Sequence, residues 1–145
     1  MSSDKDRIKT KALELGFDDV RVTPAELPPE VRDRFRAFVE AGHHGTMAWL
    51  EDRLDKRAQP RELWPEVRTA IVLGVNYGPE GDPLSKLDAK STGNLSVYAG
   101  GDDYHELIKK RLKTLGRWMA ETFGCELKVF VDTAPVAEKP LAEKA

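Results

Sequence analysis

Apolar residues recur along this chain at two spacings, every three to four residues in some segments and every second residue in others. The first helical spacing covers residues 5–15, with Asp4 placed to cap the helix and Gly16 to end it in a left-handed conformation. A second helical run should pack against the core and end at Gly42; its apolar residues are Val31, Phe35, Phe38 and Val39. A third predicted helix begins at Thr46 and presents Met47, Leu50 and Leu54.

The longest helical pattern follows Asp102 and Asp103 and ends at Gly124. Its apolar face is expected to be buried, while the opposite face carries basic residues, namely Lys109, Lys110, Arg111, Lys113 and Arg117. A basic stripe of this kind can contact the phosphates of a nucleic acid. A solvated helix face is the simpler explanation of the same charges.

Strand patterns are shorter, and the β-branched run from Thr69 to Val75 is the strongest of them. Shorter strands are predicted over 17–22 and 95–98. Residues 56–65 are expected to form a polar connector, and 76–94 a long loop that acts as a lid or rim. Together these elements predict an α+β fold with a small mixed sheet flanked by helices.

Residues 125–131 alternate apolar with polar side chains and are predicted to form a half-buried strand that Pro135 ends. Asp132 then lies where the strand ends, on the same face as Phe130. One interpretation is that Asp132 accepts N–H bonds from Thr133 and Ala134, as aspartate does in many turns. The other is that its carboxylate lines a cofactor pocket.

Composition restricts the class of protein further. The chain has 145 residues, a net charge of −2 and a pI near 6.0, which fits one domain or part of one and gives no overall sign of nucleic-acid binding. The charged start of the chain does not resemble a signal peptide, and the apolar run 70–75 is too short to cross a bilayer. A cytoplasmic monomer without a membrane segment is therefore expected.

Metal binding within the chain is not predicted. His43 and His44 are neighbours in a loop, without a third ligand at helical spacing. Cys125 is the single cysteine, so the chain cannot supply the several cysteines that an iron–sulfur cluster or a structural zinc site needs. The helix expected from Pro140 has little room before Ala145, and the sequence looks truncated there.

Four segments, taken in order, resemble the epoxyqueuosine reductase family; they are residues 42–50, 57–75, 98–105 and 131–145. The resemblance implies an N-terminal portion, spanning residues 1–145, of an incomplete nitroreductase-like, cobalamin-binding domain. The ferredoxin-like domain with two [4Fe-4S] clusters and the helical-repeat domain of the family would lie outside this chain. The implied activity of the parent enzyme is reduction of epoxyqueuosine to queuosine in tRNA, with cobalamin as cofactor.

The same resemblance assigns residues to a site. Asp132 matches the aspartate that the family places beside the cobalt as proton donor, and Tyr104 and His105 match its Tyr-His pair. Arg57, Ser96 and Tyr98 match positions that contact cobalamin. The chain alone is expected to be inactive.

Two other classes of protein remain open. The chain could be a stand-alone module that binds a corrinoid, or RNA through its basic helix face, without catalysis. A flavin-dependent relative of the nitroreductases would follow from fold analogy alone.

Overall fold

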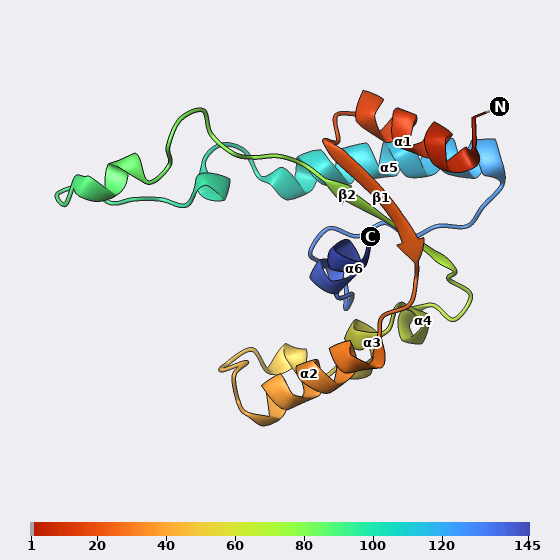
Figure 1. Ribbon diagram of the computed structural model, residues 1–145, viewed down its shortest axis with the longest axis horizontal. Helices are drawn as coiled ribbons and strands as arrows, with labels where there is room; N and C mark the ends of the chain where they lie inside the picture. The colour runs from red at the N-terminus through yellow and green to blue at the C-terminus, as the bar shows by residue number, and fades with distance from the viewer. Residues whose placement is uncertain (1) are drawn as a thin grey trace.

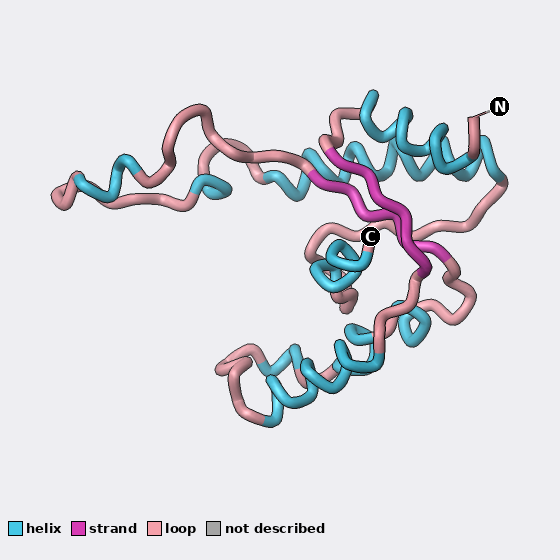
Figure 2. The backbone as a smooth tube through the Cα atoms, viewed as in Figure 1, coloured by secondary structure: helices cyan, strands magenta, loops and turns pink. Residues whose placement is uncertain are grey.

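The structure is a computed structural model that describes residues 2–145 and has the predicted α+β class, with a small sheet and flanking helices. In chain order, its elements are α1 (Asp4–Glu14), β1 (Asp19–Pro24), α2 (Pro29–Glu40), η1 (Ala48–Leu50), α3 (Leu54–Ala58), α4 (Pro60–Leu63), β2 (Thr69–Gly74), η2 (Ser85–Asp88), η3 (Val97–Ala99), α5 (Tyr104–Phe123) and α6 (Glu138–Lys144). Figure 1 shows α1 and α5 along one side of the strands and α2 to α4 grouped apart from them. The stretch between β2 and α5, which contains η2 and η3, forms a long extension that is here called the arm. Figure 2 shows that much of the chain is loop.

The sheet consists, over residues 2–145, of β1 and β2 paired antiparallel. Strand β1 begins two residues later than predicted and includes Pro24, which lies opposite Thr69. The N–H of Ala25 donates to the carbonyl of Arg68 at 2.9 Å. Because hydrogen-bonded pairs alternate along an antiparallel ladder, the nitrogen of Pro24 faces away from β2 and no ladder bond is lost.

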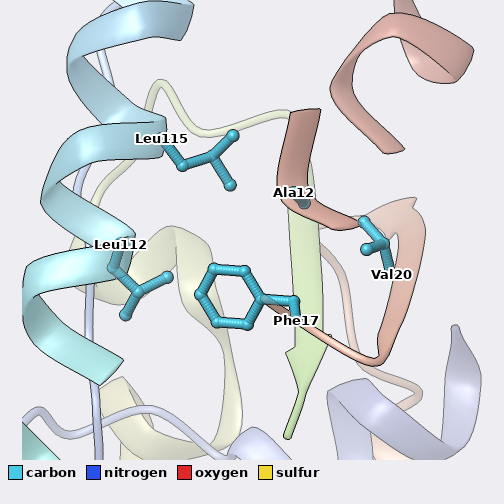
Figure 3. Packing of buried hydrophobic residues seen from close by; sticks show 5 residues of the cluster. All are labelled: Ala12, Phe17, Val20, Leu112 and Leu115. Atoms are coloured by element: carbon cyan, nitrogen blue, oxygen red, sulfur yellow. The ribbon is translucent and has the colours of Figure 1, made fainter. Parts of the chain in front are cut away.

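The core lies between the strands and the two helices beside them. Ala12 of α1, Phe17 and Val20 meet Leu112 and Leu115 of α5, as Figure 3 shows. All five are buried, with exposed fractions of 8% or less. The predicted apolar face of α5 is therefore confirmed as a core face.

A second packed region fixes α6 against the end of β1. Leu141 of α6 is buried there, and so are the apolar residues Ala25, Leu27 and Ala58. The Nζ of Lys144 donates to the carbonyls of Pro24, at 3.4 Å, and of Glu26. These contacts determine where the segment before α6 runs, and that segment contains Asp132.

Local signals predicted the two helices beside the sheet well. Helix α5 begins after Asp103, whose Oδ1 accepts the N–H of His105 at 2.9 Å, and ends at Gly124 with φ of +62°. Helix α1 ends before Gly16 as expected, with φ of +89°. Its N-cap is Ser3 rather than Asp4, because Ser3 and Asp6 form a reciprocal capping box.

The region from α2 to α4 departs from the prediction. Helix α2 has the predicted span, but none of its residues is buried, and Phe38 is 39% exposed. The helix predicted from Thr46 is wrong, because the segment forms only the 3₁₀ turn η1 before α3 begins at Leu54. The predicted connector 56–65 contains most of α3 and all of α4. Helices α2, α3 and α4 pack mainly against one another.

Two predicted strands are absent from residues 2–145. Residues 95–98 lead into the 3₁₀ turn η3. Residues 125–131 keep the alternation of half-buried and exposed side chains as far as Val129, but they pair with no strand. Side-chain alternation follows from an extended backbone, whereas a strand also needs a neighbour for its hydrogen bonds.

Candidate functional site

Asp132 lies at the end of the extended segment 125–131, in the turn that leads into α6. Its φ is +49°, the only positive φ of a non-glycine residue among residues 2–145. Aspartate enters this left-handed region more readily than most residues. The N–H of Asp132 donates to Oε1 of Glu138 at 3.1 Å. The turn leaves the carboxylate of Asp132 56% exposed.

Tyr104, the first residue of α5, reaches this carboxylate across the fold. Its Oη donates to Oδ2 of Asp132 at 2.7 Å, although the two residues are 28 positions apart. The bond to Asp132 is the main reason that the pKa of Tyr104 is raised to about 12. The Asp132 carboxylate thus accepts a hydrogen bond from Tyr104, and the bonds expected from the N–H groups of Thr133 and Ala134 do not form.

His105 lies between two carboxylates. Its Nδ1 is 2.8 Å from Oδ1 of Asp103, and its Nε2 is 3.8 Å from Oδ2 of Asp132. The imidazole stacks on the ring of Tyr104, with 4.1 Å between ring centroids. Hydrogen bonds from the N–H and the ring of His105 lower the pKa of Asp103. The N-cap of α5 thus also orients the histidine.

Glu138, the first residue of α6, is a site residue that the sequence interpretation missed. Its carboxylate is half-buried and accepts the N–H of Asp132. Burial, followed by the nearby charge of Asp132, raises the pKa of Glu138. The spacing Asp132 to Glu138 could have suggested a turn contact, but only the fold shows which glutamate faces Asp132.

Arg57 lies near this turn through its main chain, since its carbonyl accepts the N–H of Ala137 at 3.1 Å. Its guanidinium lies 4.6 Å from the centroid of the Trp49 ring. Burial lowers the pKa of Arg57, and its Nε is buried without a hydrogen-bond partner in the structure. A buried N–H without a partner is costly, and Arg57 shares this feature with Nε of Arg32.

Ser96 and Tyr98 lie on the arm that precedes α5, and Tyr98 is close enough to Tyr104 to contribute to the raised pKa of that tyrosine. Tyr98 is 60% exposed in η3, and Ser96 precedes that turn without a side-chain hydrogen bond that caps it. Over residues 2–145, neither side chain forms a hydrogen bond or ring contact with Tyr104, His105 or Asp132. Hydrogen bonds and short contacts thus join Asp132, Tyr104 and His105 into one site, whereas Ser96 and Tyr98 form no hydrogen bond with it.

The predicted loop histidines have other partners. Nε2 of His44 lies 3.0 Å from Oε1 of Glu51, and the ring of His43 lies against Phe38. In the part of the chain that the structure describes, no group of three or more His, Cys, Asp or Glu side chains is placed to hold a metal ion. No helix in that part is both long enough and apolar enough to cross a membrane.

A cavity of about 800 Å³, here called the central cavity, opens beside the site. Tyr104, Asp132 and Glu138 line it together with apolar residues of β2 and α5. Two carboxyl groups and a tyrosine at the edge of an apolar cavity, with His105 beside them, can position and move a proton. This chemistry fits an enzyme site that protonates a bound group.

Solved structures define the class of this fold. A crystal structure of epoxyqueuosine reductase with an epoxyqueuosine-modified tRNA-Tyr stem loop matches 97% of this chain with a TM-score of 0.76, at 20% identity. The epoxyqueuosine reductase from Streptococcus thermophilus matches 93% of the chain with a TM-score of 0.72, at 22% identity. The chain covers 37% and 36% of those two proteins. Its fold is that of the corresponding part of an epoxyqueuosine reductase.

Sequence comparison leads to the family. The sequence model described as epoxyqueuosine reductase QueG, DUF1730, matches residues 57–133, which is more than half of the chain. The epoxyqueuosine reductases of Vibrio cholerae and Salmonella typhimurium are 38% and 39% identical to it over 141 and 140 residues. The chain belongs to the epoxyqueuosine reductase QueG family. It spans 38% and 36% of the length of these two relatives, although they match 96% and 95% of the chain.

Proposed function

We propose that this chain is the portion of an epoxyqueuosine reductase that holds the proton donor, Asp132. Reduction of the epoxide consumes two electrons and two protons, breaks both carbon–oxygen bonds, forms the alkene of queuosine and releases the oxygen as water. The departing oxygen needs an acid, and a positioned side chain contributes about 10²–10⁴-fold to such a step. The carboxylate that Tyr104 and His105 approach from α5 is the observation that supports this role.

The neighbours of Asp132 have supporting roles in this proposal. Tyr104 keeps its proton at neutral pH and fixes one carboxylate oxygen through its 2.7 Å hydrogen bond. His105, oriented by Asp103, lies 3.8 Å from Asp132 and would return a proton to it after turnover once the two side chains move closer or a water bridges them. Glu138 holds the backbone of Asp132 in its left-handed turn.

Cobalamin is the cofactor that we propose for the site. When bound, it would supply the electrons for reduction of the epoxide carbon. Asp132, Tyr104 and His105 would border its reactive face, and the buried Nε of Arg57, which has no partner, could donate to one of its amide or phosphate oxygens. Ser96 and Tyr98 would approach from the arm. The [4Fe-4S] clusters would belong to the remainder of the parent enzyme.

The proposed substrate is tRNA that carries epoxyqueuosine, as in the solved stem-loop complex of a structural neighbour. Four basic residues lie on one exposed face of α5, which begins at the site: Lys109, Lys110, Lys113 and Arg117. None of them forms an ion pair with another residue of the described chain, 2–145. At 1.5 Å per residue, Arg117 lies roughly 20 Å along the helix from Tyr104, so the stripe could follow an RNA backbone away from the site.

The test uses a chimera in which this chain replaces the matching region of the Vibrio cholerae enzyme. Asp132→Asn keeps the shape of the side chain but removes the acid. We expect it to bind cobalamin and to reduce an epoxyqueuosine-modified stem loop about 10²–10⁴-fold more slowly than the unmutated chimera. Asp88→Asn, which changes an exposed aspartate in η2 by the same substitution, should leave turnover unchanged.

Equal turnover by the Asp132→Asn and unmutated chimeras would rule out the proton-donor role. Gel filtration of the 145-residue chain with cob(II)alamin addresses binding separately. Co-elution in the absence of turnover by the chimera would favour a corrinoid-binding module. We propose that the chain by itself does not turn over, because it holds none of the electron-transfer groups of the parent.

A further inference from the structure

The central cavity separates two extended segments of the fold. One wall consists of residues 69–73 of β2 and of Val75, which follows that strand, and the other wall is the segment 125–132. Helix α5 forms the floor through residues at helical spacing, Ile108, Leu112, Leu115 and Met119. Each extended segment lines the cavity with consecutive residues. Side chains of a strand alternate between its faces, so a cavity lined by consecutive residues lies along the edge of that strand.

The alternation of hydrogen-bonded and non-hydrogen-bonded pairs between β1 and β2 shows which backbone N–H and C=O groups of β2 face this cavity. The bond from Ala25 to Arg68 makes them a hydrogen-bonded pair, and every second pair after it is also bonded. Ala70 and Val72 therefore bond to β1. The N–H and C=O groups of Ile71 and Leu73 point the other way, and no partner for them exists among residues 2–145.

The opposite wall also has unpaired main-chain groups. No backbone N–H or C=O of residues 125–131 takes part in a hydrogen bond of the described chain. The segment is nevertheless held in place, because Val129 and Val131 pack against the core and Leu127 fits over Gly116, which has no Cβ to collide with it. Two extended backbones thus present open hydrogen-bonding edges to one apolar cavity.

Chain direction fits the same arrangement. In Figure 1, β2 and the segment 125–131 both run from the right of the view towards the left, and α5 connects them. Parallel strands need a crossover of this type, most often a helix. Neighbouring strands lie about 4.8 Å apart, so a cavity between two such strands is the space that one further strand would occupy.

We propose that the central cavity receives one β-strand, supplied by the part of the parent enzyme outside the region that matches this chain. The curated relatives contain that additional sequence, because this chain spans only 38% of the Vibrio cholerae protein. The strand pairs with β2 on one edge and with residues 125–131 on the other. Helix α5 covers one of its faces, and Leu141 of α6 lies on the cavity wall as well. A strand covered on both faces is an almost continuous run of Val, Ile and Leu.

This inference concerns the sheet and does not depend on the proposed reductase chemistry. It has a consequence for the site, because the inserted strand would be the direct neighbour of the segment that ends at Asp132. The position of Asp132 would then be fixed by ladder bonds as well as by Glu138. In the isolated chain, Asp132 is held by the contact of its N–H with Glu138 and by the hydrogen bond from Tyr104.

Amide hydrogen exchange, resolved by residue, tests the inference. In the 145-residue chain, the amides of Ile71 and Leu73 should exchange at least ~10-fold faster than that of Val72, because only Val72 donates to β1. In the chimera with the Vibrio cholerae enzyme, Ile71 and Leu73 should become as protected as Val72. Equal protection of the three amides in the isolated chain would overturn the proposal. So would unprotected Ile71 and Leu73 amides in the folded chimera.

A peptide measurement decides the matter if the chimera does not fold. The probe is a short peptide of alternating valine and isoleucine with a lysine at each end, since main-chain bonds provide most of the affinity in strand addition. Its matched control carries N-methyl groups on every second residue, which removes donors while keeping the side chains. The unmethylated peptide alone should protect Ile71 and Leu73. Protection by neither peptide, or equal binding of both as expected for a pocket that takes apolar small molecules, would overturn the proposal.

Discussion

At the scale of single residues, the site depends on how one carboxylate is held. Asp132 accepts a hydrogen bond through its side chain from Tyr104 and donates one through its main chain to Glu138. Its left-handed φ is a conformation that costs most non-glycine residues about 1–2 kcal/mol. Aspartate adopts this conformation more readily than most residues, so the turn accepts the side chain that supplies the carboxylate.

Titration of Tyr104 provides a direct test of its bond to Asp132. The raised pKa, about 12, means that the bond stabilises the fold below pH 10, the ordinary value, and that this contribution is lost as the pH rises through 12. Asp132→Asn should lower the pKa of Tyr104 towards 10, because the charge that opposes phenolate formation is removed. The pKa of Tyr104 is measured from the ultraviolet absorbance of its phenolate, and the signal that is lost in Tyr104→Phe belongs to this residue. Circular dichroism at each pH shows whether the protein is still folded. The same midpoint in both proteins would show that the bond does not form in solution.

Glu138 should make stability depend on pH in the opposite sense to a normal surface carboxylate. Its pKa is raised in the folded state, so its stabilising contribution is present at low pH and is lost as the pH rises through the folded value. Glu138→Gln keeps an oxygen that accepts the N–H of Asp132 and removes the charge. The variant should therefore gain stability relative to wild type as the pH rises above 4.5, the ordinary value for glutamate, measured by denaturant unfolding. Glu143→Gln, on the exposed side of α6, is the control and should show no such gain.

At the scale of elements, the sequence predicts a helix or strand correctly when residues close in sequence determine it, and fails when the element needs a partner distant in sequence. Helix α5 follows from local signals, since Asp103 caps it, Gly124 ends it and its apolar residues recur on one face. The strand predicted over 125–131 is wrong because, among residues 2–145, no strand pairs with this extended segment. The helix predicted from Thr46 is wrong because its apolar residues find no core to cover.

In the site as well, the sequence identified the residues that local motifs mark and missed the contacts that depend on the fold. Sequence and resemblance selected Asp132, Tyr104 and His105, which the fold brings together. Neither could show that the partner of the Asp132 N–H is Glu138, because that contact depends on a left-handed residue and on the docking of α6. Side-chain partners across 28 residues are a property of packing rather than of local pattern.

The basic stripe of α5 can be tested as an element. Lys110→Gln with Lys113→Gln removes two exposed charges from it, and Lys86→Gln with Lys90→Gln removes two from the arm. If the stripe contacts phosphates, the first pair should weaken binding of an RNA stem loop and should reduce the slope of log affinity against log salt by roughly 1–2. The second pair, with the same net charge, should do neither. Equal effects of the two pairs on filter-binding titrations would mean that only overall charge matters.

At the scale of the whole molecule, the chain combines a packed centre with parts that lack a partner. Helices α1 and α5 and the sheet share one core, whereas β2 has an open edge and α2 buries none of its residues. The arm that precedes α5 leaves several large apolar side chains exposed, among them Tyr77, Leu84, Leu87 and Leu95. Exposed apolar surface of this extent is typical of a contact area. The exposed apolar side chains of the arm are therefore a candidate contact surface.

We expect the arm to contribute little to the free energy of unfolding of the core. Residues 81–93 at its far end are all exposed, so replacing them with a short glycine–serine linker removes no core contact. Shortening a loop by half changes the closure entropy by only about 0.6 kcal/mol, and the free energy of unfolding should stay within about 1 kcal/mol of wild type. Leu112→Ala, which empties a buried position of α5, should by contrast cost about 2–5 kcal/mol in the same denaturant titration. A loss of that size in the shortened variant would mean that the arm packs on the core in solution, and its apolar residues would then be core residues rather than a contact area for the rest of the enzyme.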